Sequence, residues 1–247
     1  MAGRDPGRTG VFVDFDGTLA PIVEDPASAR PHDQAVEVLR VLSRRWGRVA
    51  VISGRPAAFL VEHLRGSGAT RFYGLYGLER SGPDGPVETH PDALRWRRAV
   101  DEAAEVAEMT LGASAVERKG LTLTLHYRSI PERRVAVQGL TNDLAARTGL
   151  VAHGGKMSVE LRPPVGVDKG RVVRELAGGL RAAVFAGDDL GDLPAFAEMA
   201  ALRGAGVATL TVASGGGETP VEVLEAADVT VNGPEGIMSV LRELAGR

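Results

Sequence analysis

Carboxylates stand at two places in the sequence where a short apolar stretch ends. Asp14 and Asp16 lie in DFDGT after the run GVFV, and Asp188, Asp189 and Asp192 follow AAVFAG. Two like charges two residues apart on a strand point to the same side, which is unfavourable unless a cation or a shared proton intervenes. Hard oxygen ligands with room for phosphate suit Mg²⁺ better than zinc or calcium. The pattern suggests a magnesium site, although a turn cap beside a solvated carboxylate explains a bare aspartate pair equally well.

Two further positions are compatible with an anion. Ser53 and Gly54 follow the apolar run RVAVI and offer a hydroxyl, an open backbone and the start of a helix, although an ordinary helix cap explains them singly. Lys169 begins another expected helix, where a positive charge is unfavourable without a nearby anion, although a solvated lysine is the simpler explanation. Separate explanations for each residue do not account for a phosphate-compatible or metal-compatible residue at the end of every central strand. We therefore expect a joint phosphate and metal site at the carboxyl edge of one sheet.

The elements that would position these groups alternate between apolar strands and helices. Strands without polar alternation, joined by helices, are typical of a parallel sheet covered on both faces, so the fold class is α/β. We expect strands at 10–16, 48–54, 72–77, 182–187, 206–213 and 229–233, with helices at 31–46, 56–66, from 168, after 192 and at the end.

A different module interrupts this rhythm after the turn-forming segment SGPDGP at 81–86. It has the order αββαββ, with an antiparallel sheet whose last two strands are joined across Gly154 and Gly155. We therefore expect a core domain of residues 1–83 and 164–247 and an inserted smaller α/β domain of residues 84–163. The expected elements of the insert are helices at 91–111 and 131–148 and strands at 114–119, 121–128, 150–154 and 156–163.

The insert carries charged residues at alternating strand positions. Glu117 and Lys119 share one side of their strand, and Lys156, Glu160 and Arg162 share one side of theirs. These faces are either solvated, with charges paired across the hairpins, or turned toward a ligand. Carboxylates and ammonium groups together suit a polyhydroxylated sugar, because its hydroxyls both donate and accept hydrogen bonds.

Composition narrows the remaining classes. The 247 residues are 44% hydrophobic and 25% charged with a formal net charge of −3, which provides no basic field for nucleic acid. The absence of cysteine excludes disulfides, thiolate metal sites and cysteine nucleophiles. No window approaches the ~20 apolar residues that span a bilayer. We expect a cytoplasmic monomer with a small-molecule partner and no contact with membranes.

The segments DFDGT, Ser-Gly-Arg, an isolated lysine and GDDLGD, in this order, resemble the four motifs of the haloacid dehalogenase superfamily. The resemblance implies a Rossmann-like core in which Asp14 attacks phosphorus to give an aspartyl phosphate. It implies that Asp16 protonates the leaving oxygen and later activates water. It also implies that Asp14, the backbone carbonyl of Asp16 and Asp188 hold Mg²⁺.

The same resemblance assigns supporting roles. An acid at position 16 favours a phosphatase over the dehalogenases and ATPases of the superfamily. The insertion lies where the superfamily places its cap, here of the C2B type, which closes over the leaving group and excludes water. Residues that match phosphate-binding positions are Thr18, Ser53, Gly54 and Lys169, and those that would orient Lys169 or metal-bound water are Asp189 and Asp192.

The segments ERKG, HYR and GKMSVELRPP, followed by DKG, resemble the trehalose-phosphate phosphatases, and this similarity runs from about Gly10 to the end. It implies hydrolysis of trehalose 6-phosphate to trehalose and inorganic phosphate, the last step of trehalose biosynthesis. Two positions depart from the family pattern, since Tyr76 replaces a usual histidine and Gly191-Asp192-Leu193 replaces T-D-E. The residues that match the family's contacts to glucose hydroxyls are Glu117, Lys119, Lys156 and Glu160.

Two alternatives to this function remain open. The same chemistry could act on sucrose 6-phosphate, a mannosyl phosphoglycerate or a pseudo-disaccharide phosphate, because the cap sets the leaving group. A non-catalytic subunit that binds a sugar phosphate would keep the fold and lose turnover. Phosphate release from a panel of sugar phosphates tests the first alternative. The presence or absence of turnover tests the second.

Overall fold

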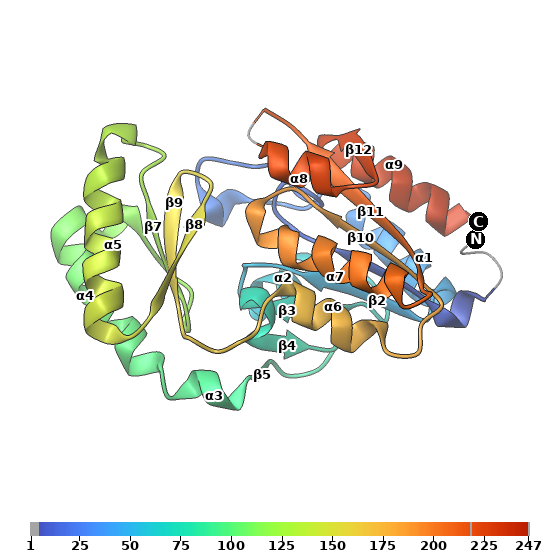
Figure 1. Ribbon diagram of the computed structural model, residues 1–247, viewed down its shortest axis with the longest axis horizontal. Coiled ribbons are helices and arrows are strands. Elements are labelled where there is room, and N and C mark those ends of the chain that lie inside the picture. Colours follow the sequence, from blue (N-terminus) through green and yellow to red (C-terminus); the bar gives the residue numbers. More distant parts are fainter. Residues whose placement is uncertain (1–4, 218, 247) are drawn as a thin grey trace. The chain divides into compact units, whose positions relative to one another are not determined.

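The computed structural model describes residues 5–217 and 219–246, and it divides into two compact units (Figure 1). The first unit combines the chain up to Glu88 with the chain from Val167 onward, and the second is Thr89–Gly166. The first unit contains an eight-stranded sheet in the order β12-β11-β10-β1-β2-β3-β4-β5, and the second a four-stranded sheet in the order β6-β7-β9-β8. Within the described residues, no helix combines the length and apolar character needed to cross a bilayer.

The strands of the first unit are β1 (Thr9–Val13), β2 (Arg48–Ile52), β3 (Arg71–Gly74), β4 (Glu79–Ser81), β5 (Glu88–Thr89), β10 (Ala182–Gly187), β11 (Ala208–Gly215) and β12 (Val229–Asn232). Its helices are α1 (Ala35–Arg45), α2 (Ala57–His63), α6 (Lys169–Ala177), α7 (Leu193–Gly204), α8 (Val221–Ala226) and α9 (Gly233–Gly246). The second unit contains α3 (Pro91–Leu94), α4 (Arg97–Leu111), β6 (Val116–Arg118), β7 (Leu123–His126), α5 (Arg134–Thr148), β8 (Val151–Gly155) and β9 (Ser158–Arg162).

Alternation along the central strands builds two apolar layers in the first unit. Val11 and Val13 of β1 pack in one cluster with residues of α1, α2 and α9, whereas Phe12 packs in another with residues of α6, α7 and α8. In Figure 1, α6 and α7 run side by side across one face of this sheet. Every residue of β1 is buried, so the strand has no solvent-exposed face. The expected parallel sheet covered on both faces is confirmed.

Several element boundaries differ from the sequence expectation. The helix expected from Pro31 begins at Ala35, and the helix expected over residues 91–111 is interrupted between α3 and α4. The short strands β4 and β5 extend the sheet beyond β3, and α8 lies between β11 and β12; none of these three was expected. Each has six residues or fewer, which is too short to display a clear hydrophobic period.

The second unit has the expected order αββαββ and an antiparallel sheet. Leu123 and Leu125 of β7 join residues of α4 and α5 in one apolar cluster, so one face of this sheet is covered by the two helices. The turn between β8 and β9 was placed wrongly at Gly154 and Gly155. Both glycines pair with β9, and the turn consists of Lys156 and Met157, with Met157 at a φ of 52°.

Candidate active site

The carboxyl ends of β1, β10 and β2 bring the sequence-predicted groups of the first unit to one edge of the sheet. Asp14 follows β1 and its N–H donates to the Ala186 carbonyl oxygen at 2.9 Å, while Asp188 directly follows the neighbouring β10. The strand order reverses at β1, because the chain continues to β2 on one side and returns to β10 on the other. Crevices that bind ligands in open α/β sheets lie at such a switch point.

Lys169 joins the two aspartate motifs. The Asp168 carboxylate accepts a hydrogen bond from the Arg171 N–H at 2.8 Å and caps α6, so Lys169 is the first residue of that helix. Its Nζ donates to Asp14 Oδ1 at 2.7 Å and to Asp192 Oδ1 at 2.6 Å. The Lys169 side chain is 2% exposed, so this ammonium group is held among carboxylates away from water.

Asp192 is fixed by backbone donors as well as by Lys169. Its Oδ2 accepts hydrogen bonds from the N–H groups of Asp188 at 2.9 Å and Asp189 at 3.1 Å. Asp189 Oδ1 in turn accepts from the Gly191 N–H at 2.8 Å, which completes a reciprocal cap at η7 (Leu190–Asp192). Asp192 and Asp189 therefore lock the loop that carries Asp188 and orient Lys169.

Burial and charge imbalance dominate the electrostatics of this cluster. Burial raises the pKa of the Asp14 carboxyl well above its ordinary value, although the Lys169 ammonium opposes the rise. Burial likewise raises the pKa of Asp192. Burial disfavours the Lys169 ammonium, but the carboxylates of Asp14 and Asp192 prevail and raise its pKa well above the ordinary value. Lys169 thus pairs with two buried carboxyl groups, and Asp188 places a third buried carboxyl group beside them.

A divalent cation fits this imbalance. Asp14, Asp188 and Asp192 each offer an oxygen atom within 4.8 Å of the others. Both oxygens of Asp192 accept hydrogen bonds, from Lys169 and from the loop, and Asp14 Oδ1 also accepts from Lys169. Gly17, at a φ of 75°, leaves no room for a side chain, since a Cβ there would lie 1.9 Å from Asp188 Oδ2. An oxygen-only set of buried carboxylates is typical of a hard cation.

Hydroxyls and an open backbone border the carboxylates. Thr18 is fully buried, and among the described residues its Oγ1 has no hydrogen-bond partner, which is costly unless a ligand supplies one. Ser53 follows β2, and its Oγ accepts from the Arg55 N–H at 3.1 Å. Gly54 lies against Tyr76, whose hydroxyl oxygen would be 2.6 Å from a Cβ at position 54. These groups suit phosphoryl oxygens.

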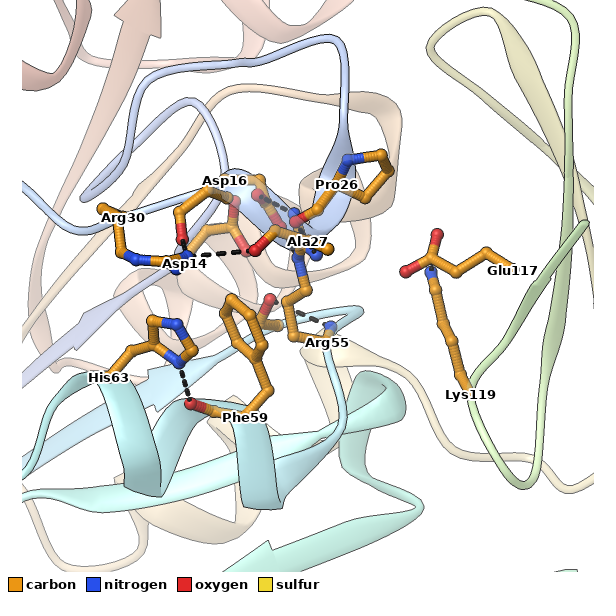
Figure 2. A network of polar contacts seen from close by, with 12 residues as sticks. Asp14, Asp16, Pro26, Ala27, Arg30, Arg55, Phe59, His63, Glu117 and Lys119 are labelled. Carbon is orange, nitrogen blue, oxygen red and sulfur yellow. Dashed lines mark hydrogen bonds and ion pairs between the residues drawn. The ribbon is translucent and has the colours of Figure 1, made fainter. Parts of the chain in front are cut away.

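Asp16 is oriented differently from Asp14. Its carboxylate accepts two hydrogen bonds from Arg55, from Nε to Oδ2 and from Nη2 to Oδ1, both at 2.7 Å. Figure 2 shows the Arg55 side chain directed toward Asp16 and Pro26. The side chain of Asp16 is thus paired with Arg55 and does not belong to the Asp14–Asp188–Asp192 group.

In the second unit, a polar cluster lies on the sheet face opposite the leucines. Lys119 Nζ is 3.9 Å from Glu117 Oε2 and 3.4 Å from Glu160 Oε1, so three of the four expected sugar-binding residues meet. The fourth, Lys156, lies instead in the β8–β9 turn, where its carbonyl accepts from Arg128 Nη2 at 3.5 Å. It lies outside β9, so the strand alternation used to place it with Glu160 does not extend to it.

Glu160 has several charged and hydrogen-bonding partners in this cluster. Burial opposes its ionisation, but the charges of Lys119 and Arg162, with hydrogen bonds from Thr122 and Arg162, lower its pKa to about 2. Thr122 Oγ1 donates to Glu160 Oε1 at 2.8 Å, and Arg162 Nη2 donates to Oε2 at 2.8 Å. Glu117 adds His126, whose Nε2 lies 2.9 Å from Glu117 Oε2. Glu160 is therefore held as a carboxylate.

Three contributors had no role in the site expected from the sequence. Thr122, just before β7, donates to Glu160. Arg55 follows Ser53-Gly54 directly, but only the fold shows that it reaches Asp16. Ser214 Oγ donates to the Gly17 carbonyl oxygen at 2.6 Å from β11, and no local sequence signal marks it.

The fold is the one found in haloacid dehalogenase-like hydrolases. A haloacid dehalogenase-like hydrolase of Bacteroides thetaiotaomicron shares the fold at a TM-score of 0.65 and 15% identity, covering 96% of this chain and 99% of that chain. The family model described as trehalose-phosphatase matches residues 12–229. The chain belongs to the trehalose-phosphatase family.

Relatives and solved structures agree with this assignment. A trehalose-phosphate phosphatase of Mycolicibacterium paratuberculosis is 35% identical over 207 residues, covering 79% of this chain and 52% of that protein. This chain thus spans about half the length of the curated trehalose-phosphate phosphatase it matches. An uncharacterised glycosyl hydrolase of Mycobacterium tuberculosis is 34% identical over 79% of this chain and 15% of its own length. The C-terminal domain of the Candida albicans trehalose-6-phosphate phosphatase superposes with a TM-score of 0.79 at 25% identity, covering 97% of this chain and 93% of that chain.

Proposed function

We propose that the chain is a Mg²⁺-dependent phosphatase that hydrolyses trehalose 6-phosphate to trehalose and inorganic phosphate, the last step of trehalose biosynthesis. The observation that carries this proposal is the buried cluster of Asp14, Lys169, Asp188 and Asp192 in a chain of the trehalose-phosphatase family. The names of the matched relatives support the choice of sugar phosphate.

Asp14 is the nucleophile. Its carboxylate oxygen attacks phosphorus while the bond from phosphorus to the sugar oxygen breaks, and Asp16 supplies the proton that the leaving oxygen takes. In the second step a water oxygen attacks phosphorus, its proton passes to Asp16, and the bond to Asp14 breaks. The Lys169 ammonium and the hydroxyls of Thr18 and Ser53, with the backbone of Gly54, hold the phosphoryl oxygens.

Asp14, the backbone carbonyl of Asp16 and Asp188 would hold Mg²⁺. When bound, the ion neutralises charge on the phosphoryl oxygens and offsets the excess of carboxylates around Lys169. Asp192 and Asp189 keep the Asp188 loop and the Lys169 side chain in place through the hydrogen bonds of η7.

The inserted domain, expected at residues 84–163 and compact over Thr89–Gly166, forms the cap that recognises the sugar. Glu117, Lys119 and Glu160 bind glucose hydroxyls, because carboxylate oxygens accept from hydroxyl protons and the ammonium donates to hydroxyl oxygens. Lys156 contributes from the β8–β9 turn. Thr124 supports a ligand on this face, since its hydroxyl is buried and has no partner among the described residues.

Phosphate release from a panel of sugar phosphates tests the substrate. Trehalose 6-phosphate should exceed sucrose 6-phosphate, mannosyl phosphoglycerate and pseudo-disaccharide phosphates by more than about tenfold in kcat/KM, or ~1.4 kcal/mol. A tenfold preference for another member would move the assignment to that leaving group.

The nucleophile is tested separately. Asp14→Asn should lower kcat by at least ~10³-fold with the fold intact, because the amide oxygen is a poor nucleophile. Exposed Asp33→Asn, which lies outside the site, should leave kcat unchanged. Turnover that survives in the Asp14 variant would contradict the aspartyl-phosphate mechanism, and an inactive wild-type protein would favour a binding subunit.

We further propose that the protein acts as a cytoplasmic monomer. Charged sugar phosphates do not cross bilayers unaided, so their hydrolysis belongs in the compartment that makes them. Light scattering at enzyme concentrations used in assays should give a single species near the chain mass of 25.9 kDa.

A further inference from the structure

The Asp16 carboxylate is held at both of its oxygens by the side chain of Arg55. Arg55 donates from Nε and Nη2 to the two oxygens of Asp16, each at 2.7 Å, and from Nη1 to the Pro26 carbonyl oxygen at 2.7 Å. Such a bidentate pair fixes the plane of the carboxylate as well as its position. The rotamer of Asp16 is therefore set by Arg55.

The Arg55 side chain packs in turn against an aromatic ring. Its Cζ lies 4.7 Å from the centre of the Phe59 ring, and Phe59 packs edge-on against Phe15 with ring centres 5.5 Å apart. Phe15 is the residue between Asp14 and Asp16, so the support returns to the strand end that carries both acids. Figure 2 shows Phe59 beside Arg55, on the side away from Pro26. The Arg55 side chain is 10% exposed, which favours a single orientation.

The fork leaves part of the Asp16 carboxylate available. A carboxylate has about four lone-pair positions, and Arg55 occupies one on each oxygen. The Asp16 side chain remains 33% exposed, so its other positions reach solvent. A proton donor and acceptor needs this combination, because it must be aimed in advance and still reach the reacting oxygen.

We propose that Arg55 is a positioning residue for proton transfer by Asp16. The proposal rests on the proposed function, in which the Asp16 proton goes to the sugar oxygen as the P–O bond breaks and a proton from water returns to Asp16 in the second step. Arg55 acts through the orientation of Asp16 and makes no contact with the phosphoryl group. The contribution of Arg55 to the rate should therefore be largest for leaving groups that must be protonated in order to depart.

Leaving-group dependence tests this role. A sugar alkoxide needs a proton to depart, whereas 4-nitrophenolate leaves as an anion, and kcat/KM reports only the steps up to that departure. Arg55→Met should lower kcat/KM at least ~30-fold for trehalose 6-phosphate but less than ~3-fold for 4-nitrophenyl phosphate, since a general acid contributes ~10²–10⁴. Retained hydrolysis of the aryl ester also shows that the variant folds.

Three companion proteins sharpen the result. Arg55→Lys keeps the charge but not the fork, so its loss with the sugar phosphate should be intermediate. Adding Arg55→Met to Asp16→Asn should cause no further loss, because the group that Arg55 orients is already absent. Arg40→Met, which removes a surface fork to Glu37 on α1, should behave as wild type with both substrates.

Equal losses with both substrates would overturn the proposal, because Arg55 would then act on the phosphoryl group that they share. Unchanged kcat/KM with the sugar phosphate, or a full further loss in the Asp16→Asn background, would overturn it too. Failure of the proposed function gives a different result. The wild-type protein would then hydrolyse no sugar phosphate, or it would prefer a sugar phosphate other than trehalose 6-phosphate. In the latter case, that substrate replaces trehalose 6-phosphate in the comparison with 4-nitrophenyl phosphate.

Discussion

Asp188 lies with Asp14 and Asp192 in a group of three buried carboxyl groups. Mg²⁺ should therefore stabilise the fold, raising the melting temperature on the order of 5 °C at saturating concentration, as expected for a ligand specific to the native state. Asp188→Asn should abolish this increase, because one of two proposed carboxylate ligands is lost. Thermal melting with Mg²⁺ and with EDTA provides the measurement.

The matched control is Asp33→Asn, which changes the same charge at an exposed position away from the cluster. It should retain the full Mg²⁺-dependent increase. If Asp188→Asn also retains it, the buried cluster does not hold the ion.

Glu160 makes stability depend on pH in a defined window. Its pKa is about 2 in the folded protein against 4.5 for an ordinary glutamate. The unfolded chain binds more protons between these values, so the contribution of Glu160, about 3 kcal/mol, is present above pH 4.5 and lost as pH falls toward 2. Glu160→Gln should be less stable than wild type at pH 6.

The same comparison at low pH provides the check. The difference in unfolding free energy between wild type and Glu160→Gln should shrink as pH decreases from 5 to 2, because wild-type Glu160 then loses its charge. Glu108→Gln serves as a control, since Glu108 also has a lowered pKa but pairs with Arg118 at the surface. If the difference in unfolding free energy stays constant across this range, the partners of Glu160 do not stabilise its ionised form.

At the scale of elements, the loop after β3 supports the phosphate-binding turn after β2. Leu75 and Tyr76 in η4 (Leu75–Gly77) have φ values of 48° and 61°, a conformation that costs energy for residues with a Cβ. Their N–H groups donate to the carbonyl oxygens of Arg55 and Ser53. The Tyr76 ring centre is 5.8 Å from Lys169 Nζ. The strained loop thus places Tyr76 between the Ser53–Gly54 turn and Lys169.

Gly54→Ala tests this packing. The new Cβ would lie 2.6 Å from the Tyr76 hydroxyl oxygen and 2.8 Å from Cζ, so the ring must move. We expect a loss of about 1–3 kcal/mol in unfolding free energy, together with a lower kcat. Denaturant unfolding of both proteins measures the loss.

A double-mutant cycle identifies the cause. In a Tyr76→Ala background Gly54→Ala should cost less than ~0.5 kcal/mol, because the clashing ring is gone. Gly82→Ala, where nothing lies within 4 Å of the new Cβ, should be tolerated in both backgrounds. An equal cost of Gly54→Ala with and without Tyr76 would exclude the ring as its origin.

The parts of this fold that could be predicted are those whose hydrophobic pattern along the sequence is clear. The uniformly apolar strands β1 and β10 and the acids that follow them were recognisable, because burial on both faces leaves a continuous apolar run. The contacts of Arg55 and Ser214 were not, since they join segments 39 and 197 residues apart in the chain. The turn at Met157 was misplaced because adjacent glycines are a stronger local signal than one residue with positive φ.

At the scale of the whole molecule, the two units have separate apolar cores. The clusters around β1 and β10 draw only on the chain before Glu88 and after Val167, and the cluster around β7 draws only on residues between them. Each unit has its own sheet and helices. Stability should therefore divide along the same boundary, because a domain with its own core can fold alone.

Replacing residues 89–166 with a short Gly-Ser linker tests this division. The remaining chain should fold cooperatively and hydrolyse 4-nitrophenyl phosphate, since Asp14, Lys169, Asp188 and their hydrogen bonds all lie in the first unit. It should lose at least ~100-fold in kcat/KM for trehalose 6-phosphate, because the Glu117–Lys119–Glu160 cluster is removed. Asp14→Asn in the shortened chain should abolish the remaining activity and so identify its source. A shortened chain that does not fold would show that the cores are coupled, and one that still prefers trehalose 6-phosphate would place sugar recognition in the first unit.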